Sequence, residues 1–112
     1  VLVVDDSAVI RKIICRFLES LHVTHHACRD GLEASEWFKA NSKICCGIIT
    51  DLEMPNLGGD ALIAMATSIS PDLPCYVVSG NDIAPVNLPQ GARRAIKKPV
   101  VTQDVYFLLR EI

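Results

Sequence analysis

Aromatic residues, net charge and long apolar runs are all scarce in this sequence. Aromatic residues make up 5% of the 112 residues, and the formal net charge is −2. A chain with so little positive charge has no electrostatic reason to bind nucleic acid directly. No apolar run approaches the roughly 20 residues that cross a bilayer, and no signal-peptide pattern is present. We therefore expect a cytoplasmic domain that contacts neither nucleic acid nor a membrane.

The cysteines form no recognisable disulfide or zinc pattern, because their number is odd and no C-x-x-C spacing occurs. They are Cys15, Cys28, Cys45, Cys46 and Cys75. We expect small, mostly buried side chains in a reducing compartment. A redox role for the adjacent Cys45 and Cys46 is the alternative.

The length fits one domain with a substantial core, and 50% of the residues are apolar, as in a sheet buried on both faces. The chain begins inside an apolar run, without a methionine. We therefore expect residues 1–112 to be a single domain from a longer protein, whose targeting stays undetermined.

Three aspartates carry most of the functional information. Asp5 and Asp6 follow the apolar run 1–4, and Asp51 follows the run 47–50. Short apolar runs of this kind predict buried β-strands, so each acid should lie where a strand ends. Carboxylates that meet at one edge of a sheet raise one another's pKa, and a hard cation with oxygen ligands relieves the repulsion. The sequence therefore predicts an anionic site for Mg²⁺.

The rest of the chain predicts strands that alternate with helices. Ser7 is a candidate N-cap for a first helix, whose apolar positions are Ile10, Ile13, Ile14, Phe17, Leu18 and Leu21. Thr102 is a candidate cap for the last helix, whose inner positions are Val105, Leu108, Leu109 and Ile112. Strands are expected over 1–5, 23–28, up to Asp51, 74–79 and 93–97, and helices through Trp37 and Phe38 and over roughly 60–67.

Alternating strands and helices predict an α/β fold, in which a doubly wound parallel sheet has helices on both faces. In such sheets the ligand site lies at the carboxyl edge of the strands. Ser79 and Lys98 also follow predicted strands, so they should join the three aspartates there. Lys97 should point to the other side of its strand.

Each of these residues has a plainer explanation. Acids after a strand favour a helix N-terminus, Asp51 could be an ordinary loop acid, and surface serines and lysines are common. A metal site explains more: a carboxylate beside a cation can attack phosphorus, a hydroxyl can hold a phosphoryl oxygen, and an ammonium group can pair with both. We therefore predict Asp5, Asp6 and Asp51 as metal ligands, Asp51 as the nucleophile, and Ser79 and Lys98 as its partners.

Taken in order, these motifs resemble the receiver domain of two-component response regulators. They are Val-Val-Asp-Asp-Ser at 3–7, Asp51 with Met54-Pro55 and Gly59, Ser79-Gly80, and Lys98-Pro99. The resemblance covers essentially the whole chain and implies a five-stranded sheet of order 2-1-3-4-5. The stretch around Lys98-Pro99-Val100 is also similar to receivers attached to hybrid histidine kinases, and a multidomain response regulator is the other source we consider.

The resemblance also implies a role for each site residue. Asp51 would accept a phosphoryl group from a phosphohistidine on a histidine kinase or histidine phosphotransfer protein. Asp6, Asp51 and the backbone carbonyl of Glu53 would bind Mg²⁺, and Asp5 would act through water. Ser79 would move to hold the phosphoryl group, and Lys98 would pair with it. The domain would assist its own phosphorylation and dephosphorylation rather than act as an enzyme on other substrates.

Two departures from the family pattern concern the output. The family usually has an aromatic residue three positions before the lysine, where this chain has Ala95. The stretch 81–91 should hold the fourth helix, but its two internal prolines predict a short or irregular one. We therefore predict that switching uses a loop rearrangement, which would act on a homodimer or an attached output domain. Glu53, two residues after Asp51, should modulate the lifetime of the phosphorylated state.

Three other functions remain as alternatives. A flavodoxin-like FMN protein would need a phosphate-binding loop after the first strand, where Asp5 and Asp6 would repel a phosphate. A haloacid-dehalogenase-type hydrolase would need an Asp-x-Asp motif, whereas this chain has Asp51-Leu52-Glu53. A receiver that no longer cycles phosphate, and acts only as a protein-interaction module, is the alternative closest to the main prediction.

Overall fold

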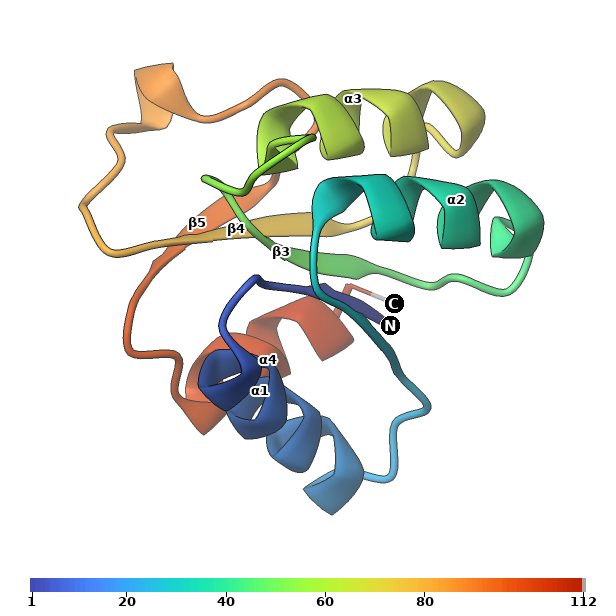
Figure 1. Ribbon diagram of the computed structural model, residues 1–112. Helices are drawn as coiled ribbons and strands as arrows, with labels where there is room; N and C mark the ends of the chain where they lie inside the picture. The colour runs from blue at the N-terminus through green and yellow to red at the C-terminus, as the bar shows by residue number, and fades with distance from the viewer. Residues whose placement is uncertain (112) are drawn as a thin grey trace.

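A computed structural model describes residues 1–111 as a five-stranded parallel sheet in the order β2-β1-β3-β4-β5 (Figure 1). Helices α1 and α4 cover one face, and α2 and α3 cover the other. The predicted fold class and strand order are confirmed. The elements in chain order are β1 (Leu2–Val4), α1 (Ala8–Ser20), β2 (His26–Cys28), α2 (Gly31–Asn41), β3 (Ile48–Asp51), α3 (Gly59–Ile69), β4 (Cys75–Ser79), a 3₁₀ turn η1 (Pro85–Asn87), β5 (Arg94–Lys97) and α4 (Thr102–Leu109).

The sheet separates two apolar cores, because successive side chains of a strand point to opposite faces. On β4, Cys75 and Val77 join the core under α2 and α3, whereas Tyr76 and Val78 join the core under α1 and α4. All of β1, β3 and β4 is buried, which explains why these strands are mostly apolar in sequence. Each fully buried aliphatic side chain contributes roughly 1.5–3 kcal/mol. The central strands are therefore a rigid base for residues at their ends.

The first two helices begin at side-chain caps. The Ser7 hydroxyl accepts a hydrogen bond from the Ile10 N–H at 3.4 Å, as the sequence predicts. The Asp30 carboxylate accepts one from the Glu33 N–H at 2.8 Å. These contacts satisfy amide groups that have no partner within the helix.

Four predictions about the elements need correction. Thr102 is not the cap of α4 but its first residue, because the Val101 N–H binds the Asp104 carboxylate at 2.9 Å. Strand β2 starts at His26 rather than at residue 23, and β1 ends one residue earlier than expected. Ile13 is 40% exposed rather than fully on the inner face of α1. Ile112 lies outside the described residues.

The segment between β4 and β5 lacks a full helix, which confirms the prediction from its prolines. Only the η1 turn forms, and Val86 at this turn is 88% exposed. Ile83 and Leu88 nevertheless pack against the core under α2 and α3, as does Ala95. Gly91 has φ +92°, and a Cβ there would lie 2.9 Å from the Thr67 hydroxyl, so the segment returns close against α3.

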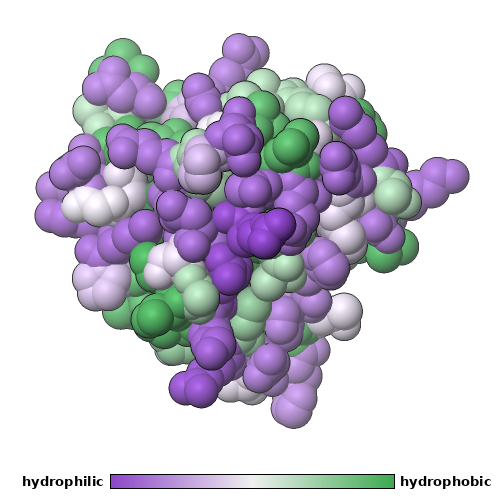
Figure 2. Space-filling view, viewed as in Figure 1, coloured by the Kyte–Doolittle hydropathy of each residue, from purple (hydrophilic) through white to green (hydrophobic). Residues whose placement is uncertain are grey.

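The surface is mixed in character. Figure 2 shows separate apolar patches among hydrophilic side chains on the face seen in Figure 1. Single exposed apolar residues of this kind are ordinary in folded domains. Within residues 1–111, every helix is too short or too polar to cross a membrane.

Candidate functional site

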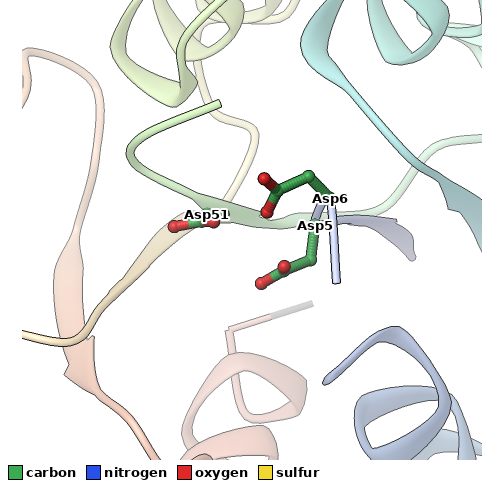
Figure 3. Close-up of side chains that lie close together, drawn as sticks. All are labelled: Asp5, Asp6 and Asp51. Carbon is green, nitrogen blue, oxygen red and sulfur yellow. The ribbon is translucent and has the colours of Figure 1, made fainter. Parts of the chain in front are cut away.

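The carboxyl ends of two neighbouring strands bring the three aspartates together. Val4 pairs with Thr50, so Asp5 and Asp51 leave the sheet side by side, and Asp6 follows Asp5. Figure 3 shows the three side chains converging at the ends of β1 and β3. One carboxylate oxygen from each lies within 4.8 Å of the others. Opposite ligands of an octahedral Mg²⁺ stand roughly 4.2 Å apart, so the cluster is close to the size of such a site.

The aspartates differ in burial, and one oxygen lacks a hydrogen bond. Asp5 is 0% exposed and Asp51 is 6% exposed, whereas Asp6 faces solvent. One Asp5 oxygen accepts a hydrogen bond from the Ser7 N–H at 2.8 Å. The other, Oδ2, is buried and has no hydrogen-bond partner among the described residues. A buried carboxylate oxygen without a hydrogen-bond donor is destabilising, and a bound cation, directly or through one of its water ligands, would satisfy it. The residues present therefore fit a divalent cation.

Burial and mutual repulsion shift the titration of this cluster. Burial raises the pKa of Asp5, and the Ser7 N–H and the Lys98 charge oppose that rise. Burial also raises the pKa of Asp51, and the charge of Asp5 raises it further, while Lys98 again opposes. Both shifts mean that the negatively charged site is unfavourable without additional positive charge.

Lys98 supplies one positive charge at the correct place. Its Nζ atom lies 3.6 Å from Asp5 Oδ2 and 3.5 Å from Asp51 Oδ2. The Lys98 N–H donates to the Ser79 carbonyl at 2.8 Å, which fixes the residue beside the end of β4. Lys97 points elsewhere, as predicted, and forms an exposed ion pair with Asp82 at 3.4 Å. The lysine side chain therefore bridges the two most buried carboxylates.

Ser79 lies next to Asp51 across the sheet, and Glu53 follows Asp51 by two residues along the chain. Val78 pairs with Asp51 across the sheet, so Ser79 ends β4 one residue beyond it. Ser79 is 7% exposed, and its hydroxyl accepts a hydrogen bond from the Asn81 N–H at 3.2 Å. The side chain of Glu53 is exposed. The Glu53 backbone N–H is close enough to the Asp51 carboxylate to lower the pKa of Asp51, against the larger effect of burial. The predicted site residues are thus gathered at one edge, and their individual roles remain predictions.

The sequence did not reveal two side chains that hold the backbone of the site. The Arg11 guanidinium donates to the carbonyl of Asp5 at 2.7 Å, and the Thr50 hydroxyl donates to the carbonyl of Asp51 at 3.0 Å. Both bonds end on main-chain oxygens, which carry no residue pattern. Only the presence of a polar residue in the apolar run 48–50 could have pointed to Thr50.

Comparison with known proteins decides the family. Residues 1–110 match the response regulator receiver domain family. The chain belongs to this family. It is 31% identical, over 98% of its length, to the transcription factor SKN7 of Chaetomium thermophilum. The chain spans only 7–28% of the length of the curated relatives it matches.

Solved structures give the same fold. A response regulator receiver domain protein from Clostridium thermocellum superposes with a TM-score of 0.86 at 26% identity, covering 97% of this chain and 89% of that one. The receiver domain of a sensor histidine kinase from Pseudomonas aeruginosa, which has a magnesium ion coordinated in its active site cleft, gives a TM-score of 0.80 at 21% identity, covering 97% and 92%. The likeness to the second protein is evidence of the fold alone.

Membership in the family settles the class of function. The chain is a receiver domain of two-component systems, a signalling phosphoacceptor domain. Receiver domains bind Mg²⁺ in an acidic pocket, and the cluster of Asp5, Asp6 and Asp51 has that character. They also interact with histidine kinases. Neither the family nor the fold favours an FMN protein, a hydrolase or a receiver that no longer accepts phosphate.

Proposed function

We propose that Asp51 accepts a phosphoryl group from a phosphohistidine, in a reaction that requires Mg²⁺. The observation that carries this proposal is the placement of the Asp51 carboxylate between two further aspartates and the Lys98 ammonium group. The carboxylate is the nucleophile, and the neighbouring groups form a site for a cation and for phosphoryl oxygens.

In this proposal Asp6, Asp51 and the Glu53 carbonyl bind the metal directly, and Asp5 binds through water. When bound, Mg²⁺ offsets negative charge on the phosphoryl group. The burial of Asp5 supports its indirect role, because Ser7 and Lys98 already hold its carboxylate in place. Asp6 is exposed and free to turn toward an incoming ion.

The transfer itself exchanges one bond to phosphorus for another. An Asp51 carboxylate oxygen attacks phosphorus, the P–N bond to the donor imidazole breaks, and the imidazole keeps the electron pair and takes a proton from solvent. Lys98 pairs with a phosphoryl oxygen, and the Ser79 hydroxyl turns to donate to another. Water later attacks phosphorus in line, which releases inorganic phosphate and restores the carboxylate. In this sense the domain assists its own phosphorylation and dephosphorylation.

The donor histidine must approach Asp51 from outside, and an apolar groove lies beside this approach. The groove has a volume of about 340 Å³ and is lined by Ile10, Ile13, Lys98, Pro99 and Val100. Ile13 is 40% exposed, and Val9 on the same helix is 67% exposed. We propose that the histidine kinase or phosphotransfer protein packs on this surface.

The five cysteines are all free thiols, which supports a proposed reducing, cytoplasmic setting.

The output is proposed to pass through the segment 80–92. Ser79 is linked to this segment through the Asn81 N–H, so a move of the hydroxyl toward a phosphoryl group breaks that bond. Ala95 carries no ring that could change rotamer with Ser79. A rearrangement of residues 80–92 would then change the surface of the domain. We propose that this surface contacts either a second copy of the domain or an output domain in a longer protein.

Glu53 is proposed to tune the lifetime of the phosphorylated state, because its exposed side chain follows Asp51 by two residues and carries a charge that could orient or repel the attacking water. We expect Glu53→Ala to change the dephosphorylation rate by a few-fold, measured by loss of label from phosphorylated protein. An unchanged rate would reject this role.

Mass spectrometry after incubation with a small phosphodonor tests the proposal. We expect an adduct of one phosphoryl group that requires Mg²⁺ and is absent in Asp51→Asn. Asp72→Asn, which removes an exposed acid away from the site, should still form the adduct. No adduct on the wild-type chain under any condition would instead support a protein-interaction module.

A further inference from the structure

Thr50 is a polar side chain within an apolar core. It is 0% exposed, and its neighbours in the sheet register are Val4 and Val77. A valine would fill the same space without the need for a hydrogen-bond partner, and a buried hydroxyl is unfavourable unless it has one. The Thr50 hydroxyl donates to the carbonyl of Asp51 at 3.0 Å. The hydroxyl is therefore committed to the residue that we propose as phosphoacceptor.

The peptide that joins Asp51 to Leu52 is held at both ends. Its N–H, from Leu52, donates to the Val78 carbonyl at 3.0 Å, and its oxygen accepts from Thr50. Gly59 lies against the same peptide: a Cβ on Gly59 would be 2.3 Å from the Asp51 oxygen, and the Gly59 N–H donates to the Leu52 carbonyl at 2.9 Å. These contacts fix the direction in which the chain leaves β3.

That direction determines where Glu53 lies. The Glu53 N–H faces the Asp51 carboxylate, and its carbonyl is a proposed metal ligand. A rotation of the preceding peptide would displace both groups from the acidic cluster. We propose that Thr50 is a positioning residue, whose buried hydroxyl orients the Asp51–Leu52 peptide and so presets the loop for Mg²⁺ and the phosphoryl group. This inference rests on the proposed function.

Two substitutions separate the hydroxyl from the rest of the side chain. Thr50→Val keeps shape and burial but removes the donor, whereas Thr50→Ser keeps the donor and removes a methyl group. We expect Thr50→Val to bind Mg²⁺ about tenfold more weakly than wild type in calorimetric titrations, the effect of losing one hydrogen bond. Thr50→Ser should remain within about twofold. In metal-free protein, the Leu52 and Glu53 amide resonances should shift in Thr50→Val only.

Val77→Ala provides the matched control, because it weakens the same core without touching the Asp51 carbonyl. It should lower stability and leave the Mg²⁺ affinity unchanged. Wild-type affinity in Thr50→Val, or a loss that Val77→Ala reproduces, would overturn the role of Thr50 alone. If Thr50→Val does not fold, Thr50→Ala is compared with Thr50→Ser, and equal affinities overturn it too. A wild-type chain that binds no Mg²⁺ would overturn the proposed function together with this inference.

Discussion

The two sides of the candidate site are built differently. On the β1–β3 side, Asp5 and Asp51 are buried, and a Cβ on Gly59 would meet backbone at 2.3 Å. On the β4–β5 side, a Cβ on Gly80 would meet nothing within 4 Å, and the following segment forms only a 3₁₀ turn. The buried acids proposed to bind the cation therefore lie on a closely packed side, whereas the segment that follows Ser79 has room to rearrange.

The largest expected effect tests the close packing on the β1–β3 side. We expect Gly59→Ala to destabilise the protein by about 3 kcal/mol, because the new methyl group must displace the Asp51 carbonyl. Gly80→Ala, the matched substitution on the β4–β5 side, should change the free energy of unfolding by less than about 0.5 kcal/mol. Urea denaturation of both variants measures the difference. Equal effects would show that the two sides are packed alike.

Adjacent lysines give the second test, since only one belongs to the site. We expect Lys98→Met to slow phosphorylation of Asp51 by roughly a hundredfold, the usual effect of removing one group that stabilises developing charge. Lys97→Met removes only an exposed ion pair with Asp82 and should leave the rate within about twofold. The rates are measured with the same small phosphodonor. A similar loss in both variants would mean that general positive charge, not the Lys98 contact, is responsible.

The third test uses the pH dependence of stability. Because folding raises the pKa of Asp5 and Asp51 above the ordinary value of 3.8, the folded state binds protons more tightly than the unfolded chain. Stability from these groups is therefore present below that value and is lost as pH rises through the raised pKa values. We expect Asp51→Asn to be more stable than wild type by about 1 kcal/mol at neutral pH without Mg²⁺.

Urea denaturation across pH measures this difference, which should vanish in acid and shrink when Mg²⁺ is added to the wild type. Asp72→Asn serves as the control and should show no pH-dependent gain. A gain for Asp51→Asn that persists below the ordinary aspartate pKa would show that the burial and repulsion of an ionised Asp51 carboxylate are not its cause.

The sequence was sufficient to place the acids and the lysine because their signal is local. An apolar run followed by a carboxylate predicts a strand end, and parallel strands bring their ends together. Lys98 could be separated from Lys97 by the alternation of a strand alone. The missing fourth helix also followed from local chemistry, since proline removes a helical donor.

Other features depend on tertiary contacts that leave no pattern. The edge strand β2 is short, and His26 and Ala27 are exposed, so periodicity could not locate its start. The cap of α4 was misplaced because Asp104, inside the helix, binds the Val101 amide. Thr50 and Arg11 act on backbone oxygens, and any strand or helix offers such acceptors.

The smallest effect of a substitution is expected on the β4–β5 side. Val86 is 88% exposed, so we expect Val86→Ser to leave the phosphorylation rate unchanged and to change the free energy of unfolding by less than about 0.5 kcal/mol.

Phosphorylation of Asp51 should nevertheless shift amide resonances throughout 80–92, because Ser79 must release the Asn81 N–H. The change should reach Ile83 and Leu88, which pack with Ala95 against the core. Spectra of free and phosphorylated protein that agree across 80–92 would refute a loop-based switch.

Such agreement, together with shifts confined to the β1–β3 side, would reverse the comparison between the two sides. The groups that bind the phosphoryl group would then also carry its signal. Shifts across 80–92 that are lost in Ser79→Ala, with phosphorylation intact, would instead place the connection at the Ser79 hydroxyl. The chemistry would then depend on the buried strand ends. The response would depend on the segment 80–92, where Pro85 and Pro89 prevent a full helix, and on the small side chain of Ala95.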